Sequence, residues 1–164
     1  MGYSCAMGFK AQKSTYATGR PKRIAIDHDD YHAKHIGKLG DGRQFFLTQP
    51  FRPAGGNDEG CEYVALFLFA ADGSLDSATI ESFGPRATLD PDKLTSYYNQ
   101  QLSGLTAPSF ERIEVSPFSV TQLGQTFGLI TREPEDSDAV WAVELLPGNY
   151  MAFFHPWDSG IYDT

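Results

Sequence analysis

The chain has 164 residues, 41% of them hydrophobic and 21% charged, which suits a single globular domain with a full core. Its net charge of −8 is unevenly distributed: residues 1–43 carry eight bases and four acids, and the remainder carries five bases and seventeen acids. Nucleic-acid affinity depends on neutralising phosphates, so the acidic remainder argues against direct binding to nucleic acid.

The first part of the chain is predicted to pass from a flexible tail into β structure. Residues 1–22 contain turn formers and no periodicity, so we expect a tail there and a single domain over residues 23–164. Residues 23–27 alternate in hydrophobicity, which predicts a short strand. A Gly-Asp-Gly turn then precedes a predicted strand at residues 43–49, which ends before Pro50.

The clearest local signal is a hairpin in the middle of the chain. Residues 62–70 form a long apolar run, and residues 75–83 follow it after the Asp72-Gly73 pair. An Asp-Gly pair between two β-rich runs is typical of a tight hairpin turn. Neither face of the second run is cleanly apolar, so its prediction as a strand depends on the turn and on the partner strand.

Residues 91–103 are predicted to form the main helix. Asp90 suits the N-cap, Pro91 suits the first helical position, and Gly104 suits the C′ position that follows the helix. Five large apolar side chains at helical spacing form a stripe that we expect to pack in the core: Leu94, Tyr97, Tyr98, Leu102 and Leu105.

The last third of the chain returns to β structure. Four strands are expected, at residues 111–120, 124–133, 139–147 and 150–156. Pro117 has no amide proton to donate, so its strand should lie at a sheet edge or bend. Because hairpin connections dominate, the elements together predict an α+β fold, a largely antiparallel sheet of about seven strands with the helix at about residues 91–103 on one face.

The sequence gives no sign of a membrane segment or of a disulfide framework. Its longest apolar run, residues 63–71, is much shorter than the roughly 20 residues of a membrane helix, and its N-terminus lacks the apolar segment of a signal peptide. Cys5 and Cys61 form no paired motif, so we expect two free thiols rather than a disulfide. These features predict a cytoplasmic protein without membrane partners.

A polar cluster at residues 27–35 is the first candidate for a chemical function. His28, His32 and His35 are spaced H-x3-H-x2-H, and imidazole nitrogens beside carboxylates suit zinc or a similar metal. However, the aspartates of the cluster and the nearby Gly37 disfavour the helix that would bring the histidines to one face. We therefore expect a solvated loop with no metal and no cofactor, although the aspartates leave acid–base catalysis open.

The C-terminal residues 153–164 are rich in aromatic side chains for a chain end. We expect them to fold back onto the body as a clasp, with Trp157 wedged into the edge of the core. The alternative is an aromatic groove in which His155, Asp158 and Tyr162, together with Trp157, present polar groups to a ligand or partner.

Stretches at both ends of the chain resemble small bacterial proteins labelled formate hydrogenlyase regulatory (HycA-type) proteins. Near the front, the stretch "IAIDHDDYHAKHIGKLGDGRQFF" resembles their I-x-I-x-H-x-D-Y pattern and the strand that follows, at Ile24, Ile26, His28, Asp30, Tyr31, Ile36, Gly37, Phe45 and Phe46. The ending "PWDSGIYDT" resembles their P-W-D-G-x-Y-D-T ending, with Ser159 inserted, at Pro156, Trp157, Asp158, Tyr162, Asp163 and Thr164. The two stretches cover about a fifth of the chain.

The resemblance implies a regulator of formate hydrogenlyase gene expression and implies no catalytic residues. An acidic body fits a regulator that acts through protein contacts better than a repressor that binds DNA. We therefore expect a regulatory protein with a protein partner, and a basic partner would suit its charge. The partner surface would be the aromatic C-terminal end or the acidic loop at residues 133–138, and a homo-oligomer stays open.

Seven residues are the candidate binding residues: His28, Asp30, Tyr31, His155, Trp157, Asp158 and Tyr162. Two other functions remain as alternatives. One is a metal-dependent or acid–base enzyme that uses His28, Asp30 and His155. The other is an acidic immunity-type protein that neutralises a basic toxin.

Overall fold

The computed structural model of the chain describes residues 19–137 and 139–164, which contain twelve strands, one α-helix and one short 3-10 helix. In chain order the strands are β1 (Ile24–Ile26), β2 (Ile36–Lys38), β3 (Gln44–Thr48), β4 (Phe51–Arg52), β5 (Cys61–Phe69), β6 (Leu75–Ser82), β7 (Ser109–Phe110), β8 (Ile113–Val115), β9 (Phe118–Gln122), β10 (Gln125–Arg132), β11 (Ala142–Leu146) and β12 (Ala152–Phe153). The helical elements are η1 (Arg86–Thr88) and α2 (Pro91–Ser103).

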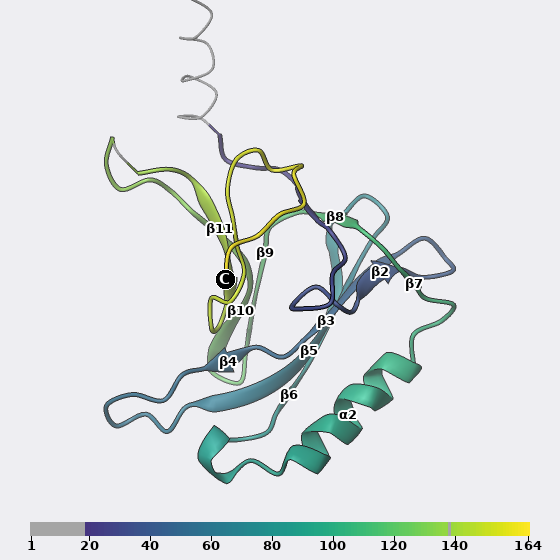
Figure 1. Cartoon of the computed structure of the whole chain (residues 1–164), viewed down its shortest axis with the longest axis vertical. Coiled ribbons are helices and arrows are strands. Elements are labelled where there is room, and N and C mark those ends of the chain that lie inside the picture. The colour runs from purple at the N-terminus through teal and green to yellow at the C-terminus, as the bar shows by residue number, and fades with distance from the viewer. Residues whose placement is uncertain (1–18, 138) are drawn as a thin grey trace, which may run out of the picture.

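Within the described ranges the strands form three antiparallel sheets (Figure 1). The largest has the order β4-β5-β3-β2-β7, with β6 added to β5; the second has the order β12-β11-β10-β9, and β1 pairs with β8 alone. The predicted α+β class and antiparallel pairing are therefore confirmed. The prediction of one sheet of about seven strands is wrong.

There are physical reasons why some strands of the structure were not predicted from the sequence. Strands β2, β4 and β7 contain only two or three residues each, too few to show an alternating pattern in the sequence. The predicted strand at residues 111–120 is divided at Ser116 and Pro117 into β8 and β9, which belong to different sheets. The proline thus marks a bend where the chain passes from one sheet to another.

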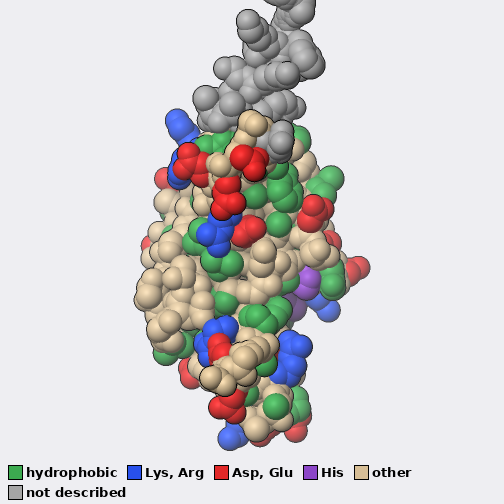
Figure 2. All heavy atoms as spheres, turned by 90° about the vertical axis from the view of Figure 1, so that its left-hand side faces the viewer, with side chains coloured by type: hydrophobic (Ala, Val, Ile, Leu, Met, Phe, Trp, Pro, Cys, Tyr) green, Lys and Arg blue, Asp and Glu red, His purple; other side chains and the backbone are tan. Residues whose placement is uncertain are grey.

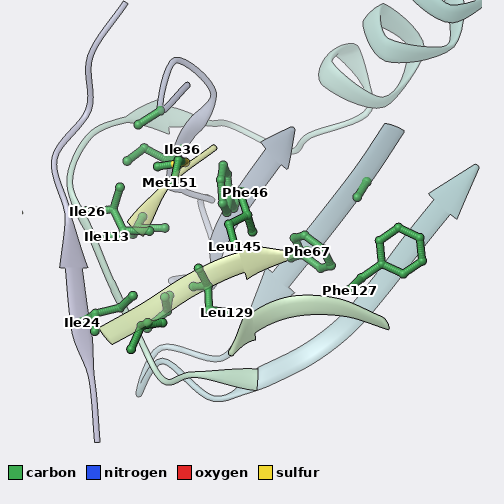
Figure 3. Close-up of a cluster of buried hydrophobic side chains, with 14 of the residues drawn as sticks. Ile24, Ile26, Ile36, Phe46, Phe67, Ile113, Phe127, Leu129, Leu145 and Met151 are labelled. Atoms are coloured by element: carbon green, nitrogen blue, oxygen red, sulfur yellow. The ribbon is translucent and has the colours of Figure 1, made fainter. Parts of the chain in front are cut away.

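The central strand β5 is buried on both faces, which explains its continuous apolar sequence. Its odd-numbered side chains, such as Tyr63 and Phe67, enter a principal core to which all three sheets contribute. Figure 3 shows Ile24 and Ile26 of β1 pointing into this core together with Phe46, Phe67 and Leu145. The even-numbered Val64 and Leu66 enter a second core on the opposite face of the sheet.

Helix α2 covers that opposite face, as predicted. Its buried Leu94 and the other four side chains of the predicted stripe pack in the second core. Asp90 caps the helix by accepting hydrogen bonds from the backbone N–H groups of Asp92 (3.1 Å) and Lys93 (3.3 Å), which confirms the predicted N-cap. Gly104 differs from the prediction, because it is the C-cap residue with φ −80° rather than a left-handed C′ residue.

A β-bulge explains the irregular pattern of β6. The pairing of β5 with β6 shifts by one residue near the hairpin turn, so that Asp76 is an extra residue on β6. The shift allows Leu75 to join Ala78 and Ile80 against the principal core. A simple count of alternating residues therefore places Leu75 on the wrong face.

Part of the predicted tail contacts the body of the protein. Residues 1–18, which include Cys5, lie outside the described residues. Gly19 accepts a hydrogen bond of 3.1 Å from the indole of Trp157, and Pro21 is buried. Cys61 is a buried free thiol. In the part of the chain that the structure describes, no helix is long and apolar enough to cross a membrane.

The Asp90 cap leads to a first prediction. We expect Asp90→Ala to lower the free energy of unfolding by about 1 kcal/mol, because two backbone N–H groups lose their side-chain acceptor. Asp90→Asn keeps an acceptor oxygen and should stay within about 0.5 kcal/mol of the natural protein. Urea denaturation measures both variants, and equal losses in the two would contradict the capping role.

Candidate functional site

The two ends of the described chain meet along strand β1 (Figure 1). One edge of β1 pairs with β8, and the other edge donates to the C-terminal segment. Ala25 N–H donates to the carbonyl of Trp157 (2.9 Å), and Asp27 N–H donates to the carbonyl of Gly160 (3.0 Å). We call this arrangement, residues 24–33 against residues 157–163, the terminal clasp. It confirms that the aromatic C-terminal end folds back onto the body.

The side chain of Tyr162 joins the two halves of the terminal clasp. Its hydroxyl donates to Oδ2 of Asp29 (2.5 Å) and accepts from the backbone N–H of His32 (3.2 Å). Oδ1 of Asp29 accepts from the backbone N–H groups of Tyr31 (2.8 Å) and Ala33 (3.0 Å), which holds the turn in shape. The phenol therefore contacts both the carboxylate and the backbone of this turn, which lies within the polar cluster at residues 27–35.

The same contacts change the ionisation of both partners. Burial would raise the pKa of Asp29, but hydrogen bonds from Tyr162 and from two backbone N–H groups hold it below its ordinary value. Burial, aided by the adjacent Asp29 carboxylate, raises the pKa of Tyr162 to about 12. At neutral pH the pair is thus a carboxylate bonded to a neutral phenol, an arrangement that stabilises structure rather than transferring protons.

Arg112 adds an electrostatic link at the edge of the terminal clasp. Its guanidinium lies 2.8 Å from a carboxylate oxygen of Asp27 and 3.7 Å from one of Glu114. It also donates to the backbone carbonyl of Asp158 (2.5 Å). These groups are exposed to solvent, so their ion pairs stabilise the clasp only modestly.

A pocket of about 420 Å³ lies beside the terminal clasp and opens to solvent. Four parts of the chain that are far apart in the sequence form it: the turn after β1, the end of β3, helix α2, and Tyr150. We call it the histidine–tyrosine pocket; its lining residues are Tyr31, His32, Lys34, His35, Leu47, Thr48, Gln49, Tyr98 and Tyr150. Its volume is within the range of small-molecule sites.

Two hydrogen-bonded pairs are built into the walls of the pocket. Nδ1 of His35 shares a hydrogen bond of 2.5 Å with the hydroxyl of Tyr98, and Thr48 Oγ1 shares one of 2.6 Å with the hydroxyl of Tyr150. The ring of His32 lies close to two tyrosine rings, with centroid distances of 3.8 Å to Tyr31 and 4.9 Å to Tyr150. The pocket is therefore largely aromatic, with polar atoms at fixed positions.

Burial favours the neutral forms of the two histidines and of Tyr98 in the pocket. Burial lowers the pKa of His32, although the negative charge of Asp29 raises it in part. Burial also lowers the pKa of His35, and electrostatic interactions with Lys34 and His28 lower it further. Burial raises the pKa of Tyr98 to about 12. Tyrosines and neutral imidazoles of this kind can bind a ligand by hydrogen bonding and stacking, but a phenol with so high a pKa is a poor general base.

Six of the seven predicted binding residues lie in the terminal clasp, but they do not converge on one cavity. Of the seven, only Tyr31 lines the histidine–tyrosine pocket. Asp30 is exposed, and the carbonyl of Asp158 binds Arg112. The indole of Trp157 is partly buried against the principal core, and Tyr162 packs there as well.

The three residues of the enzyme alternative lie in different surroundings. Nε2 of His28 donates to the carbonyl of Lys34 (2.8 Å), and its ring lies 6.2 Å from that of Phe110. His155 lies outside the clasp, with its ring 6.4 Å from that of Trp157. Among the described residues, no three His, Cys, Asp or Glu side chains are grouped so that they could hold a metal. The metal-dependent alternative therefore has no geometric support there.

Residues outside the seven predicted binding residues make most of the candidate site. Asp29 organises the turn, while Tyr98 and Tyr150 complete the pocket from positions predicted as a core stripe and a strand. His35 and Tyr98 are 63 residues apart, so nothing local in the sequence indicates that they meet. The H-x2-H spacing of His32 and His35 was a signal, but it pointed to a metal rather than to a shared pocket.

Comparisons with protein-family models, curated proteins and solved structures find no match.

Gly160 provides a test of how tightly the clasp is packed. Its φ is +82°, and a Cβ there would lie 2.3–2.5 Å from the carboxylate group of Asp27. Gly42 has a similar φ of +91° but open space around it. We expect Gly42→Ala to cost about 1 kcal/mol for its backbone conformation alone, and Gly160→Ala about 2 kcal/mol because Asp27 must also turn away.

Thermal or urea denaturation of the two glycine variants measures the difference. A larger loss in Gly160→Ala than in Gly42→Ala supports close contact between the two ends of the chain. Equal losses, at matched protein concentration and pH, would show that Asp27 and Gly160 do not meet in solution.

Proposed function

We propose that this protein is a small cytoplasmic regulatory protein that acts by binding a protein partner through the terminal clasp, not by catalysis. One observation carries the proposal: the clasp segments expose large apolar side chains. Tyr31 is 65% exposed and Ile161 is 70% exposed. Phe154, which precedes the C-terminal segment, is 39% exposed. Exposed apolar and aromatic side chains of this kind are common at protein interfaces.

The exposed side chains are held on a constrained backbone. Tyr31 lies in the Asp29 turn, and Ile161 lies between Gly160 and Tyr162, both of which contact β1 or its turn. A backbone fixed in this way loses less conformational entropy on binding than a free chain end would. This supports recognition of a folded partner.

Charge supports a basic or mixed-charge partner rather than nucleic acid. The net charge of −8 would steer a basic protein toward the molecule in a salt-dependent way. Figure 2 shows a face on which acidic and basic side chains lie among hydrophobic ones, with no continuous basic area. Glu133, Glu135 and Asp136 form an exposed acidic loop.

The resemblance of both chain ends to formate hydrogenlyase regulatory proteins supports the same class of function. The resembling residues include Tyr31, Trp157 and Tyr162, which lie in the terminal clasp. A regulator that works through this surface would need no cofactor and no catalytic group. The regulated pathway and the identity of the partner belong to this proposal.

Affinity capture with matched variants tests the proposal. The clasp variant Tyr31→Ser with Ile161→Ser removes two exposed side chains without touching the hydrogen bonds of Tyr162 or Asp29. The control variant Leu123→Ser with Val140→Ser removes side chains that are 59% and 64% exposed on other loops. Both variants should keep the melting temperature of the natural protein to within a few degrees.

We expect the natural protein and the control variant to capture the same partner from a lysate of the source organism at low salt. The clasp variant should retain about one tenth of that partner or less, because central apolar side chains carry much of the binding free energy. Equal capture by the clasp variant, or no partner for the natural protein, would contradict the proposal. Self-association measured by analytical ultracentrifugation would identify a second copy as the partner.

A further inference from the structure

The histidine–tyrosine pocket has features that the proposed protein partner does not explain. Its nine lining residues are supplied by four separate segments, and together they enclose about 420 Å³. Thr48 and Tyr150 in its wall are hydrogen-bonded to each other, so part of the polar wall is already fixed. A concave, largely preformed aromatic site of this size is typical of small-molecule binding.

The charges of the residues that line the pocket favour a negatively charged ligand. Lys34 carries the only formal positive charge among the lining residues, and none of them is an Asp or Glu. The carboxylate of Asp29 is the charge that raises the pKa of His32 against the effect of burial. Its oxygens already accept hydrogen bonds from Tyr162 and from two backbone N–H groups. A cation entering the pocket would therefore meet Lys34 with no free carboxylate, while an anion would be attracted.

The unpaired polar atoms of the pocket suit a carboxylate group. His35 uses Nδ1 for Tyr98, and among residues 19–137 and 139–164 no hydrogen bond uses its Nε2 or either ring nitrogen of His32. A tyrosine hydroxyl that donates to Nδ1 leaves Nε2 protonated, so that it becomes a donor. Lys34 and Gln49 also line the pocket, so its lining includes several side chains with donor groups that an anion could use.

The ring walls complete the description of the ligand. The ring of His32 lies next to the rings of Tyr31 and Tyr150, and Tyr98 contributes a further ring from helix α2. Flat aromatic ligands stack on or meet the edges of such rings favourably. Leu47 supplies apolar contact at the end of β3.

We propose that the histidine–tyrosine pocket binds a small aromatic carboxylate, of the size of a hydroxybenzoate, with its carboxylate near Lys34 and His35 and its ring against the tyrosines. The proposal does not depend on a protein partner. Tyr31 belongs to both the pocket and the terminal clasp, so a bound carboxylate would change the surface that the clasp presents.

Binding of 4-hydroxybenzoate to the purified full-length protein tests this inference, measured by calorimetry and by two-dimensional NMR. The probes 4-hydroxybenzamide and 4-hydroxybenzylamine have nearly the same shape but are neutral and cationic. We expect the carboxylate to bind at least about tenfold more tightly than either, because only the anion makes charge-assisted hydrogen bonds in the pocket. Its resonance shifts should centre on residues 31–35 and Tyr98.

Variants separate a specific site from weak surface binding. Lys34→Gln removes the ammonium of an exposed side chain and should weaken binding of 4-hydroxybenzoate by about tenfold. Lys93→Gln removes the ammonium of another exposed side chain, which lies on α2 outside the pocket lining, and should leave binding unchanged. His35→Gln, checked for a native-like NMR spectrum, should also weaken binding.

Three results would overturn the proposal. The first is an absence of detectable 4-hydroxybenzoate binding. The second is equal binding of the carboxylate, the amide and the amine. The third is resonance shifts centred on a separate hollow, which Gln101 and Leu105 line together with Leu66 of β5. Because no partner protein is present in these experiments, their outcome is independent of the capture experiment.

Discussion

The fold depends on satisfying both edges of a three-residue strand. Strand β1 is almost completely buried, and buried backbone N–H groups need hydrogen-bond partners. Strand β8 satisfies one edge, and the carbonyls of Trp157 and Gly160 satisfy the other. The last residues of the chain therefore complete the structure near its beginning. The side chain of Tyr162 reinforces this closure by bonding to Asp29 and to the backbone of His32.

The closure also fixes the position of the candidate site. The Asp29 turn connects β1 to β2, and it carries Tyr31, His32 and His35 to the mouth of the histidine–tyrosine pocket. The same turn presents Tyr31 to solvent beside the C-terminal segment. The proposed partner surface and the proposed ligand pocket thus share one structural support. A change in the terminal clasp would affect both, whereas a change confined to Lys34 would affect the pocket alone.

Local signals in the sequence predicted the local structure. Asp90 and Pro91 placed the start of α2, and the Asp72-Gly73 turn placed the central hairpin, because caps and turns are determined by a few neighbouring residues. The division into three sheets was not predictable, since it depends on strands of two or three residues and on the bend at Pro117. The pocket was missed for a related reason: Tyr98 and Tyr150 reach His35 and Thr48 only through tertiary packing.

A double-mutant cycle on Asp29 and Tyr162 measures how strongly this contact joins the two ends of the chain. The free energy of unfolding would be measured for Asp29→Asn, Tyr162→Phe and the double variant, with Tyr31→Phe as a control for the loss of an exposed hydroxyl. We expect a coupling energy of about 1 kcal/mol or more between Asp29 and Tyr162, because a hydrogen bond to a charged acceptor joins them. Losses that add to within about 0.3 kcal/mol would contradict it and show that the two ends of the chain are not joined through this contact.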